Sequence, residues 1–392
     1  MLTGASMDLR RQPASPSGGG RNFGLDLLRF LAIAGVVVVH CGTEFGRLLG
    51  FTLPGGVVAA AFFGVELFFV LSGFLIGGIL LDIVADGAGA RGFAVFMLRR
   101  WMRTLPLYFA CLGAFALWQP PAPPTLALYA SLTQNLAWPM PPDGFFAVSW
   151  SLTVEEWFYL LFSATLIGAV ALAGARWPIW PVILGFIATP AAARLLAGTP
   201  QDYFDSIYHI VLLRLDAIAW GVALAGLQRQ HRALFGHPLA ALGVGLVLVA
   251  LVWTAANTHL LAVGRELYLS AFLPVTSLGL ALCLVAACGL RRAPPVLGRP
   301  VVAGARISYG VYLTHVTILQ ITETYAAGHG HGGWFVVVWS LPLILLLPWA
   351  SYRWFEAPIL ARRPAQFAAA AAVRQAAGIA GIQERSARSR AS

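Results

Sequence analysis

The sequence contains no lysine and little charge of either sign. All 26 basic residues are arginines, and charged residues make up only 11% of the 392-residue chain. Ordinary globular chains carry about 25% charged residues. A soluble domain of this composition would not have enough polar side chains to cover its surface, so the shortage of charge excludes the soluble globular class.

Cysteine is scarce as well. Cys41, Cys111, Cys283 and Cys288 lie in or beside apolar stretches, and no two of them form a CxxC motif. We expect these cysteines to act as small hydrophobic residues, and we expect no metal site. The first twenty residues are polar and rich in Gly, Ser and Pro, so the first apolar helix is expected to serve as the insertion signal.

Long apolar runs dominate what is present. Hydrophobic residues make up 59% of the chain, and mean hydropathy is +0.76. Several runs reach the length of about 20 residues that crosses a bilayer as a helix, and backbone groups in hydrocarbon must pair internally. The predicted fold class is therefore all-α, a polytopic membrane protein of about ten transmembrane helices. The predicted spans are Leu25–Cys41, Val57–Leu81, Leu105–Trp118, Ser151–Ala173, Trp177–Leu196, Ile207–Leu227, Leu239–Ala256, Leu267–Gly289, Ser308–Thr322 and Trp334–Trp354.

The arginines give these spans an orientation. With the N-terminus in the cytoplasm, only Arg47, Arg265 and Arg194 fall in outer loops, as the positive-inside rule requires. Both termini are therefore predicted to be cytoplasmic, and the net charge of +10 needs no nucleic-acid partner. The arginines assigned to the inside are Arg10, Arg11, Arg21, Arg91, Arg99, Arg100, Arg103, Arg176, Arg229, Arg232, Arg291, Arg292, Arg299, Arg306, Arg362 and Arg363.

Composition divides the chain into three regions. Residues 1–21 form a polar flexible N-terminus, residues 22–360 form the membrane domain, and residues 361–392 form a cytoplasmic tail rich in Ala and Arg. Within the membrane domain, Thr125–Trp138 is apolar but short and flanked by prolines. We expect this stretch to be re-entrant or interfacial rather than a full span.

The first span, GLDLLRFLAIAGVVVVH, carries ionisable residues. Asp26 lies three residues before Arg29 and can pair with it. Arg29 and His40 are eleven residues apart, which at about 100° per residue places both on one helix face, roughly 16 Å apart along the axis. Snorkelling of Arg29 and a polar helix contact of His40 are the structural alternatives. Ionisable groups at membrane depth favour a functional role.

A second basic group lies in MLRRWMRTLPLYF. Arg100 and Arg103 are one helical turn apart, beside Arg99, at the predicted cytoplasmic start of the third span. Guanidinium groups suit bidentate phosphate contacts, so these residues and Arg29 can form a cationic mouth for a phosphorylated ligand. Simple membrane anchoring by the positive-inside rule is the alternative.

Two carboxylates occur in SWSLTVEEWFYLLF. Glu155 and Glu156 are predicted at the outer end of the fourth span. A carboxylate there can orient an imidazole or accept a hydroxyl proton. The alternative is a helix start with Ser151 as its N-cap and acidic residues favoured by the helix dipole.

Later segments add further polar residues. His315 lies in the middle of the ninth span and is either functional or a polar packing contact. Arg214 and Asp216, in the sixth span, are expected to have polar partners. His329 and His331 are too few for a metal site and are expected to form an outer loop. Ser72 is predicted to form a hydrogen bond to another helix. Close helix packing is predicted at Gly64, Gly73, Gly77 and Gly78.

Six motifs in order along residues 22–358 resemble the acyltransferase 3 family of bacterial ten-span membrane O-acyltransferases. The motifs are LDLLRFLAIAGVVVVH, GVELFFVLSGFLIGGIL, RRWMRTLPLYF, SWSLTVEEWFYL, SYGVYLTH and YRWFEAP. The residues that match the family's pattern are Arg29, His40, Arg100, Arg103, Trp150, Ser151, Leu152, Glu155 and His315. The family's aromatic neighbours of the late histidine are replaced by Thr314 and Val316, which puts a shared acceptor pocket in doubt.

The resemblance implies a multi-pass enzyme of the bacterial inner membrane, of the type without an added extracytoplasmic hydrolase-like domain. Such an enzyme moves an acyl group, usually acetyl, from cytoplasmic acetyl-CoA to a hydroxyl of a carbohydrate or glycosylated acceptor, such as exopolysaccharide or O-antigen. The implied partners are acyl-CoA, the acceptor and membrane lipid, without nucleic acid or metal. The implied catalytic residues are His40, Glu155 and His315, and the implied donor-binding residues are Arg29, Arg100 and Arg103.

Several alternatives stay open at this point. The acyl group can be succinyl or longer, and His40 can act as a base or become acylated itself. A multi-span transporter of a glycan or small molecule, or a flippase-like protein that moves a lipid-linked glycan, would also have many spans. The sequence shows no inverted repeat of the kind that many transporters contain.

Overall fold

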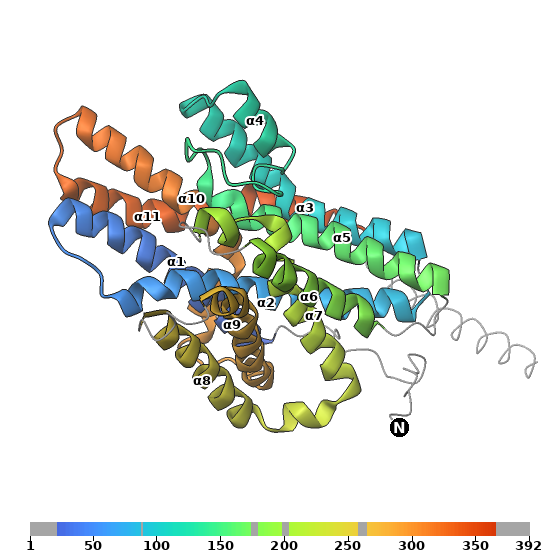
Figure 1. Cartoon of the computed structure of the whole chain (residues 1–392). Helices are drawn as coiled ribbons and strands as arrows, with labels where there is room; N and C mark the ends of the chain where they lie inside the picture. Colours follow the sequence, from blue (N-terminus) through green and yellow to red (C-terminus); the bar gives the residue numbers. More distant parts are fainter. Residues whose placement is uncertain (1–21, 88, 174–178, 198–203, 258–264, 366–392) are drawn as a thin grey trace, which may run out of the picture.

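The computed structural model describes residues 22–87, 89–173, 179–197, 204–257 and 265–365. Within these ranges all regular secondary structure is helical, as predicted (Figure 1). Residues 1–21, Arg176 and residues 366–392 lie outside the described residues, so the predicted N-terminal region and most of the predicted tail are not observed. The α-helices are α1 (Phe23–Leu49), α2 (Gly55–Ala85), α3 (Gly89–Trp118), α4 (Pro123–Ala130), α5 (Trp150–Ala173), α6 (Trp180–Ala197), α7 (Leu215–Gln230), α8 (Pro238–Asn257), α9 (Arg265–Gly289), α10 (Gly298–Gly328), α11 (Gly333–Ser351) and α12 (Ala357–Ala361). Short 3₁₀ or π turns are η2 (Ala147–Ser149), η3 (Phe204–Tyr208), η4 (Val211–Leu213), η5 (Arg232–Gly236) and η6 (Tyr352–Glu356).

Seven helical segments of the described chain are long and apolar enough to cross a membrane, which makes this a polytopic membrane protein. These segments are α1, α2, η2 with α5, α6, α8, α9, and α11 with η6 and α12. The other three predicted spans correspond to α3, α7 and α10. Helix α3 carries four arginines, α10 carries two, and α7 has only 16 residues, so length and composition alone do not identify them as spans.

The helices form two groups around α2. Helix α2 packs against α7 on one side and against α1 on the other. Helices α1, α10 and α11 contact one another and lie side by side in the blue, orange and red part of Figure 1. Helices α8 and α9 form a separate pair, and α9 packs against α1 and α2. The centre of the bundle is therefore the long apolar helix α2.

Glycine allows the closest of these packings. A Cβ atom added at Gly73 would lie 1.9 Å from the carbonyl oxygen of Ile218, and one at Gly221 would lie 2.0 Å from that of Val70. Gly64 and Gly77 also lie against neighbouring backbone, so close packing at these glycines is confirmed. The same expectation is wrong for Gly78, where an added Cβ would meet no heavy atom of another described segment within 4 Å.

The sixth predicted span is not one helix. Its first part forms the turns η3 and η4, and α7 begins only at Leu215. Arg214, the residue before α7, has φ −129° and ψ 1°, which are not helical values. The charged Arg214 side chain finds its partner on α2, and the irregular backbone before it allows that contact.

The short apolar stretch Thr125–Trp138 forms α4 and a non-helical segment. In that segment Gln134 and Asn135 are fully buried. The backbone pairs with the turn η4, because Val211 N–H donates to the carbonyl oxygen of Asn135 at 2.9 Å. The segment thus folds back into the bundle, where the side-chain amide nitrogens of Gln134 and Asn135 also find protein partners.

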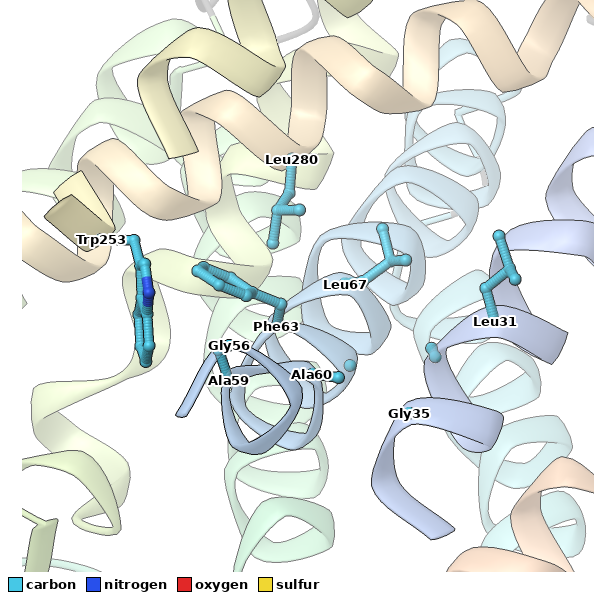
Figure 2. Close-up of a pocket in the computed structure, with 11 residues that line it drawn as sticks. Leu31, Gly35, Gly56, Ala59, Ala60, Phe63, Leu67, Trp253 and Leu280 are labelled. Carbon is cyan, nitrogen blue, oxygen red and sulfur yellow. The ribbon is translucent and has the colours of Figure 1, made fainter. Parts of the chain in front are cut away.

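An apolar groove of about 450 Å³ lies between α1, α2 and the α8–α9 pair (Figure 2). Phe63 of α2 meets Trp253 of α8 edge to face, with ring centroids 5.7 Å apart. Leu31 of α1 lines the opposite side of the groove. Leu31 precedes His40 by nine residues, which is about half a turn out of phase, so this groove lies on the face of α1 that points away from His40.

Candidate active site

The structure brings together two histidines that are 275 residues apart in the chain. His40 Nδ1 of α1 lies 2.8 Å from His315 Nε2 of α10. The two rings are stacked, with centroids 5.0 Å apart and an interplanar angle of 22°. His315 is completely buried, whereas His40 is exposed. The pair therefore has one inner and one accessible imidazole.

Hydrogen bonds assign the tautomers of this pair. His315 Nδ1 lies 3.0 Å from the carbonyl oxygen of Val311 and 2.8 Å from that of Tyr312. Carbonyl oxygens only accept, so His315 Nδ1 carries the hydrogen and its Nε2 is an acceptor. His40 Nδ1–H then donates to His315 Nε2, and the accessible Nε2 of His40 keeps its lone pair. The arrangement leaves a basic nitrogen facing outward from the α1–α10 seam.

Helices α1 and α10 run parallel in a constant register, which places the two histidines. The ring of Phe30 packs against Gly304 near one end of the seam. The ion pair between Arg47 and Glu323 lies near the other end. In each of these three contacts the residue of α10 follows its partner on α1 by nearly the same number of residues. The separation is 274 for Phe30 and Gly304, 275 for the two histidines, and 276 for Arg47 and Glu323. Residues at corresponding heights on the two helices therefore face each other.

Arg29 lies on the same uninterrupted helix as His40. Its Nη1 is 3.2 Å from Oδ1 of the buried Asp26, so the predicted pairing of these two residues is confirmed. Arg29 and His40 are separated by three turns of α1, or roughly 16 Å along the axis. The predicted placement of both side chains on one helix is thus observed, with Arg29 toward the N-terminal end.

Arg100 and Arg103 lie inside α3 rather than at its start, so the predicted helix boundary is wrong. Helix α3 begins at Gly89, well before the arginines, because residues 89–98 continue the helical pattern. The guanidinium of Arg100 lies over the ring of Tyr159, 5.5 Å from its centroid. A cation–π contact of this kind holds the guanidinium against α5.

Glu155 lies beside these arginines, and its predicted separation from them, at the outer end of a span, is wrong. Tyr159 donates from its hydroxyl to Glu155 Oε2 at 2.8 Å, and the same hydroxyl lies 2.5 Å from Ser72 Oγ. Glu155 is therefore joined to Arg100 through one tyrosine. The cause is the segment after α4, which folds back into the bundle so that α5 begins near α3. The predicted hydrogen bond of Ser72 across helices is confirmed.

Polar contacts also join α5 to α10, the helix that carries His315. Ser151 Oγ donates to the hydroxyl of Tyr312 at 2.7 Å, and the carbonyl oxygen of Tyr312 holds His315. Ser151 lies within α5 and is not its N-cap, in contrast to the alternative considered above. Nearby, the buried Glu156 accepts from Thr104 Oγ1 at 2.6 Å, and Tyr309 donates to the carbonyl oxygen of Thr104. Helices α3, α5 and α10 thus share one polar interior.

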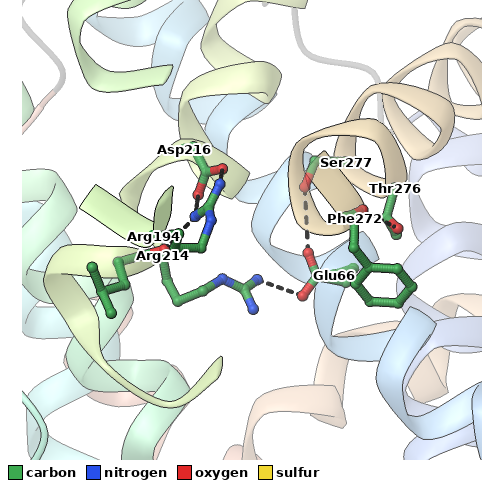
Figure 3. A network of polar contacts seen from close by, with 8 residues as sticks. Glu66, Arg194, Arg214, Asp216, Phe272, Thr276 and Ser277 are labelled. Atoms are coloured by element: carbon green, nitrogen blue, oxygen red, sulfur yellow. Dashed lines mark hydrogen bonds and ion pairs between the residues drawn. The ribbon is translucent and has the colours of Figure 1, made fainter. Parts of the chain in front are cut away.

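A separate network of buried charges lies between α2, α6 and α7 (Figure 3). Arg214 Nη2 is 2.5 Å from Glu66 Oε1, and Arg194 Nη2 is 2.6 Å from Asp216 Oδ2. All four side chains are fully buried, and their formal charges cancel. The expected polar partners of Arg214 and Asp216 are confirmed, whereas the assignment of Arg194 to an outer loop is wrong. Ser277 of α9 adds a hydrogen bond to Glu66 Oε2 at 3.3 Å.

Glu356 and Glu66 are buried carboxylates that the sequence interpretation did not assign. Glu356 lies in the π turn η6 and is 9% exposed. Its Oε1 accepts no hydrogen bond within the described residues, and the positive charge of Arg103 acts on the carboxylate. The sequence feature that could have identified both residues is an acidic residue inside an apolar motif. The motif is FEAP for Glu356 and GVELFF for Glu66.

His329 and His331 contact aromatic rings at the end of α10 and the start of α11. His329 stacks on Tyr325 at 4.1 Å, and His331 stacks on Phe335 at 4.5 Å, both at the predicted α10–α11 loop. The described part of the chain holds no group of three His, Cys, Asp or Glu side chains placed to bind a metal. The four cysteines are all free thiols.

Comparison with known proteins identifies a family for this chain. Residues 22–353 match the family described as Acyltransferase domain. The protein named "Putative O-acetyltransferase SACOL0978" of Staphylococcus aureus is 23% identical over 366 residues, covering 86% of this chain and 56% of that protein. The "Peptidoglycan O-acetyltransferase OatA" of Listeria monocytogenes is 22% identical over 364 residues, covering 86% of this chain and 55% of that protein. Among solved structures, none matches this chain significantly.

The family match covers the helices from α1 to α11. The chain spans about half the length of the curated relatives that it matches. The family match runs from the residue before α1 into the turn η6 and therefore includes His40, His315 and the arginines Arg29, Arg100 and Arg103. The chain belongs to the acyltransferase 3 family of membrane O-acyltransferases.

Proposed function

We propose that this chain transfers an acetyl group from cytoplasmic acetyl-CoA to a hydroxyl of a carbohydrate or glycosylated acceptor in a bacterial inner membrane. The observation that carries the proposal is the His40–His315 pair, in which the accessible Nε2 of His40 keeps its lone pair. A neutral imidazole with a fixed tautomer is suited to general-base catalysis on a hydroxyl. The names of the relatives favour acetyl among acyl groups.

His40 acts as the base in this proposal. Its Nε2 takes the proton of the acceptor hydroxyl while the hydroxyl oxygen attacks the carbonyl carbon of the thioester. The new C–O bond forms, the C–S bond breaks, and the leaving thiolate takes the proton from His40 Nε2. His315 is a positioning residue, because its Nε2 accepts from His40 Nδ1–H before, during and after the transfer.

The arginines bind the donor. CoA carries phosphate groups, and Arg29, Arg100 and Arg103 present guanidinium groups that suit them. Glu155 positions Arg100 through Tyr159, because the tyrosine ring contacts the guanidinium and its hydroxyl donates to the carboxylate. The long, thin thioester arm of CoA can then reach from the arginines toward His40.

The proposal includes ten spans with both termini in the cytoplasm. The helices α3, α7 and α10 complete the seven apolar segments to ten, and they pack among them rather than outside the bundle. With this orientation the N-terminal half of α1, which carries Arg29, faces the donor side. The arginine distribution supports it.

The acceptor class is proposed from family membership. A carbohydrate is favoured, and peptidoglycan is one candidate because the Listeria relative is named as a peptidoglycan O-acetyltransferase. A succinyl or longer-acyl donor, and an acyl-histidine intermediate on His40, are alternatives that the experiment below distinguishes by product mass and by trapping without acceptor.

The test uses the purified full chain in detergent. Acetyl-CoA is supplied with surface glycan taken from a host strain that lacks the gene and then stripped of O-acetyl groups by mild base. Thiol release and acetyl groups on the glycan are measured together. His40→Ala is expected to lower transfer by ~10²–10⁴-fold, as the loss of a general base does, while His329→Ala, at the exposed outer loop, transfers like the parent.

Three outcomes would overturn the proposal. The first is a parent protein that releases thiol without placing an acyl group on the glycan. The second is a His40→Ala variant that keeps activity within a few-fold of the parent. The third is movement of unmodified glycan across a membrane, which would identify a transporter.

A further inference from the structure

A surface hollow of about 620 Å³ lies at the C-terminal end of α1, where the chain turns into α2. Its volume falls in the range of about 300–1,000 Å³ that is usual for ligand sites. In Figure 1 this connection lies at the same end of the bundle as the α10–α11 connection. The hollow is lined by Thr43, Gly46, Arg47, Gly50, Phe51, Thr52, Leu53 and Val58.

The hollow begins one helical turn beyond His40. Thr43 follows His40 by three residues and Arg47 follows it by seven, so they lie roughly 4.5 Å and 10 Å further along the axis of α1. At about 100° per residue, Thr43 and Arg47 point within about 60° and 20° of the direction of His40. Leu31 of the apolar groove in Figure 2, by contrast, points about 180° away from the direction of His40. Two residues that line the hollow, Thr43 and Arg47, therefore lie toward the His40 side of α1.

The hollow carries polar groups of the kinds that hold a sugar. Arg47 pairs with Glu44 on its own helix and with Glu323 on α10, and its side chain is 56% exposed. Thr43 and Thr52 add exposed hydroxyls. Guanidinium and carboxylate groups together donate to and accept from sugar hydroxyls.

An aromatic side chain stands at the edge of the same hollow. Phe51 is 47% exposed, although it is large and apolar. A ring placed beside polar groups can cover the apolar face of a sugar. Exposed ion pairs such as that of Arg47 contribute little to stability. Folding stability therefore gives no reason for three charged side chains to gather above His40.

We propose that this hollow binds the sugar that carries the acceptor hydroxyl, with Arg47, Thr43 and Thr52 as its polar contacts and Phe51 as its apolar wall. Glu44 and Glu323 hold the guanidinium of Arg47. The inference rests on the proposed transferase function and extends it by giving the acceptor a site. The donor arginine Arg29 lies three turns from His40 toward one end of α1, and Arg47 lies two turns from it toward the other. His40 is thus placed between a donor side and an acceptor side on a single helix.

The test compares Michaelis constants for the two substrates. The purified full chain is assayed with acetyl-CoA and the same base-treated host glycan. Arg47→Ala is expected to raise the KM for glycan by about tenfold or more, the usual effect of losing a charge-assisted hydrogen bond. The KM for acetyl-CoA is expected to change by less than about twofold, because the donor arginines are on the other side of His40.

A variant that fills the hollow and a matched control are assayed beside Arg47→Ala. Thr52→Trp places a large side chain in the hollow and is expected to abolish acetyl transfer to glycan. Thr324→Trp adds the same side chain at an exposed position of α10 that does not line the hollow, and it is expected to behave like the parent. Detergent melting temperatures of all variants show whether the bundle is intact.

The outcomes separate this inference from the proposed function. If the parent does not acetylate the glycan, the proposed function is overturned. If the parent acetylates it and both Arg47→Ala and Thr52→Trp have the parent's KM for glycan, the hollow does not bind the acceptor and this inference alone is overturned. An equal rise of both Michaelis constants in Arg47→Ala would also overturn it, because it would indicate a general distortion.

Discussion

At the scale of single residues, the informative feature is a histidine that holds another histidine. A carboxylate in the position of His315 would place a full negative charge beside His40, which is costly at membrane depth. A neutral imidazole avoids this cost. Because two backbone carbonyls fix its Nδ1–H, it presents only an acceptor to His40. The accessible nitrogen of His40 is thereby set without a buried charge.

This account predicts different results for two substitutions of His315. In His315→Gln the side-chain carbonyl can still accept from His40 Nδ1–H, so transfer is expected to fall by no more than about tenfold. In His315→Leu the acceptor is lost, the tautomer of His40 is no longer fixed, and transfer is expected to fall by about 10²-fold or more. Acetyl transfer and melting temperature measured side by side check this. Equal losses in the two variants would contradict the positioning role.

The sequence predicted some residue contacts and not others, for a physical reason. The Asp26–Arg29 pair follows from helical geometry, because residues three apart are neighbours on any helix. The His40–His315 contact depends on how α1 and α10 pack, which no local pattern specifies. Glu155 was misplaced because its height depends on the fold-back of the segment after α4. Glu356 was overlooked because its burial depends on the turn η6 packing against α3.

At the scale of elements, two features of the helices place the polar groups. The parallel α1–α10 seam aligns Phe30 with Gly304 and His40 with His315. The break before α7 lets Arg214 reach Glu66. Hydrophobic pattern predicted that these segments exist, since apolar length is a local property. It did not predict the break, because the residues before Leu215 are as apolar as those after it.

The contact between α2 and α7 gives a prediction about packing. In Gly221→Ala the new Cβ would lie 2.0 Å from the carbonyl oxygen of Val70, so the two helices must move apart. Overpacking of this kind costs about 1–3 kcal/mol or more. We expect a clear fall in the melting temperature in detergent. Intrinsic tryptophan fluorescence measured during heating checks this.

Gly78→Ala is the matched control for this prediction. It lies on α2 as well, but an added Cβ there would meet no described neighbour within 4 Å. Replacing a helical glycine by alanine in free space is neutral or stabilising by about 0.5–1 kcal/mol. If both variants melted like the parent, the glycine contact between α2 and α7 would not be as close as the structure indicates.

At the scale of the whole molecule, composition predicted an all-helical membrane protein. That prediction was reliable because apolar excess and lack of charge are properties of the entire chain. The number of spans is harder to obtain, since α3 and α10 carry charges and α7 is short. Of the arginines in these helices, Arg100 and Arg103 of α3 are candidate site residues, whereas Arg299 and Arg306 of α10 are exposed. The count of spans is therefore obscured partly by candidate site residues and partly by charges at the surface.

Orientation in the membrane decides which side of His40 faces the cytoplasm, and it can be measured. Two exposed positions, Gly332 in the α10–α11 loop and Arg299 at the start of α10, lie at opposite ends of α10. In a background with the four native cysteines replaced by serine, Gly332→Cys is expected to react with an impermeant maleimide added to intact spheroplasts. Arg299→Cys is expected to react only after the membrane is opened, because the positive-inside rule places it in the cytoplasm. The reverse pattern would put Arg29 on the outer side, and both the donor-binding role of the arginines and the acceptor role of the hollow beside Arg47 would then be wrong.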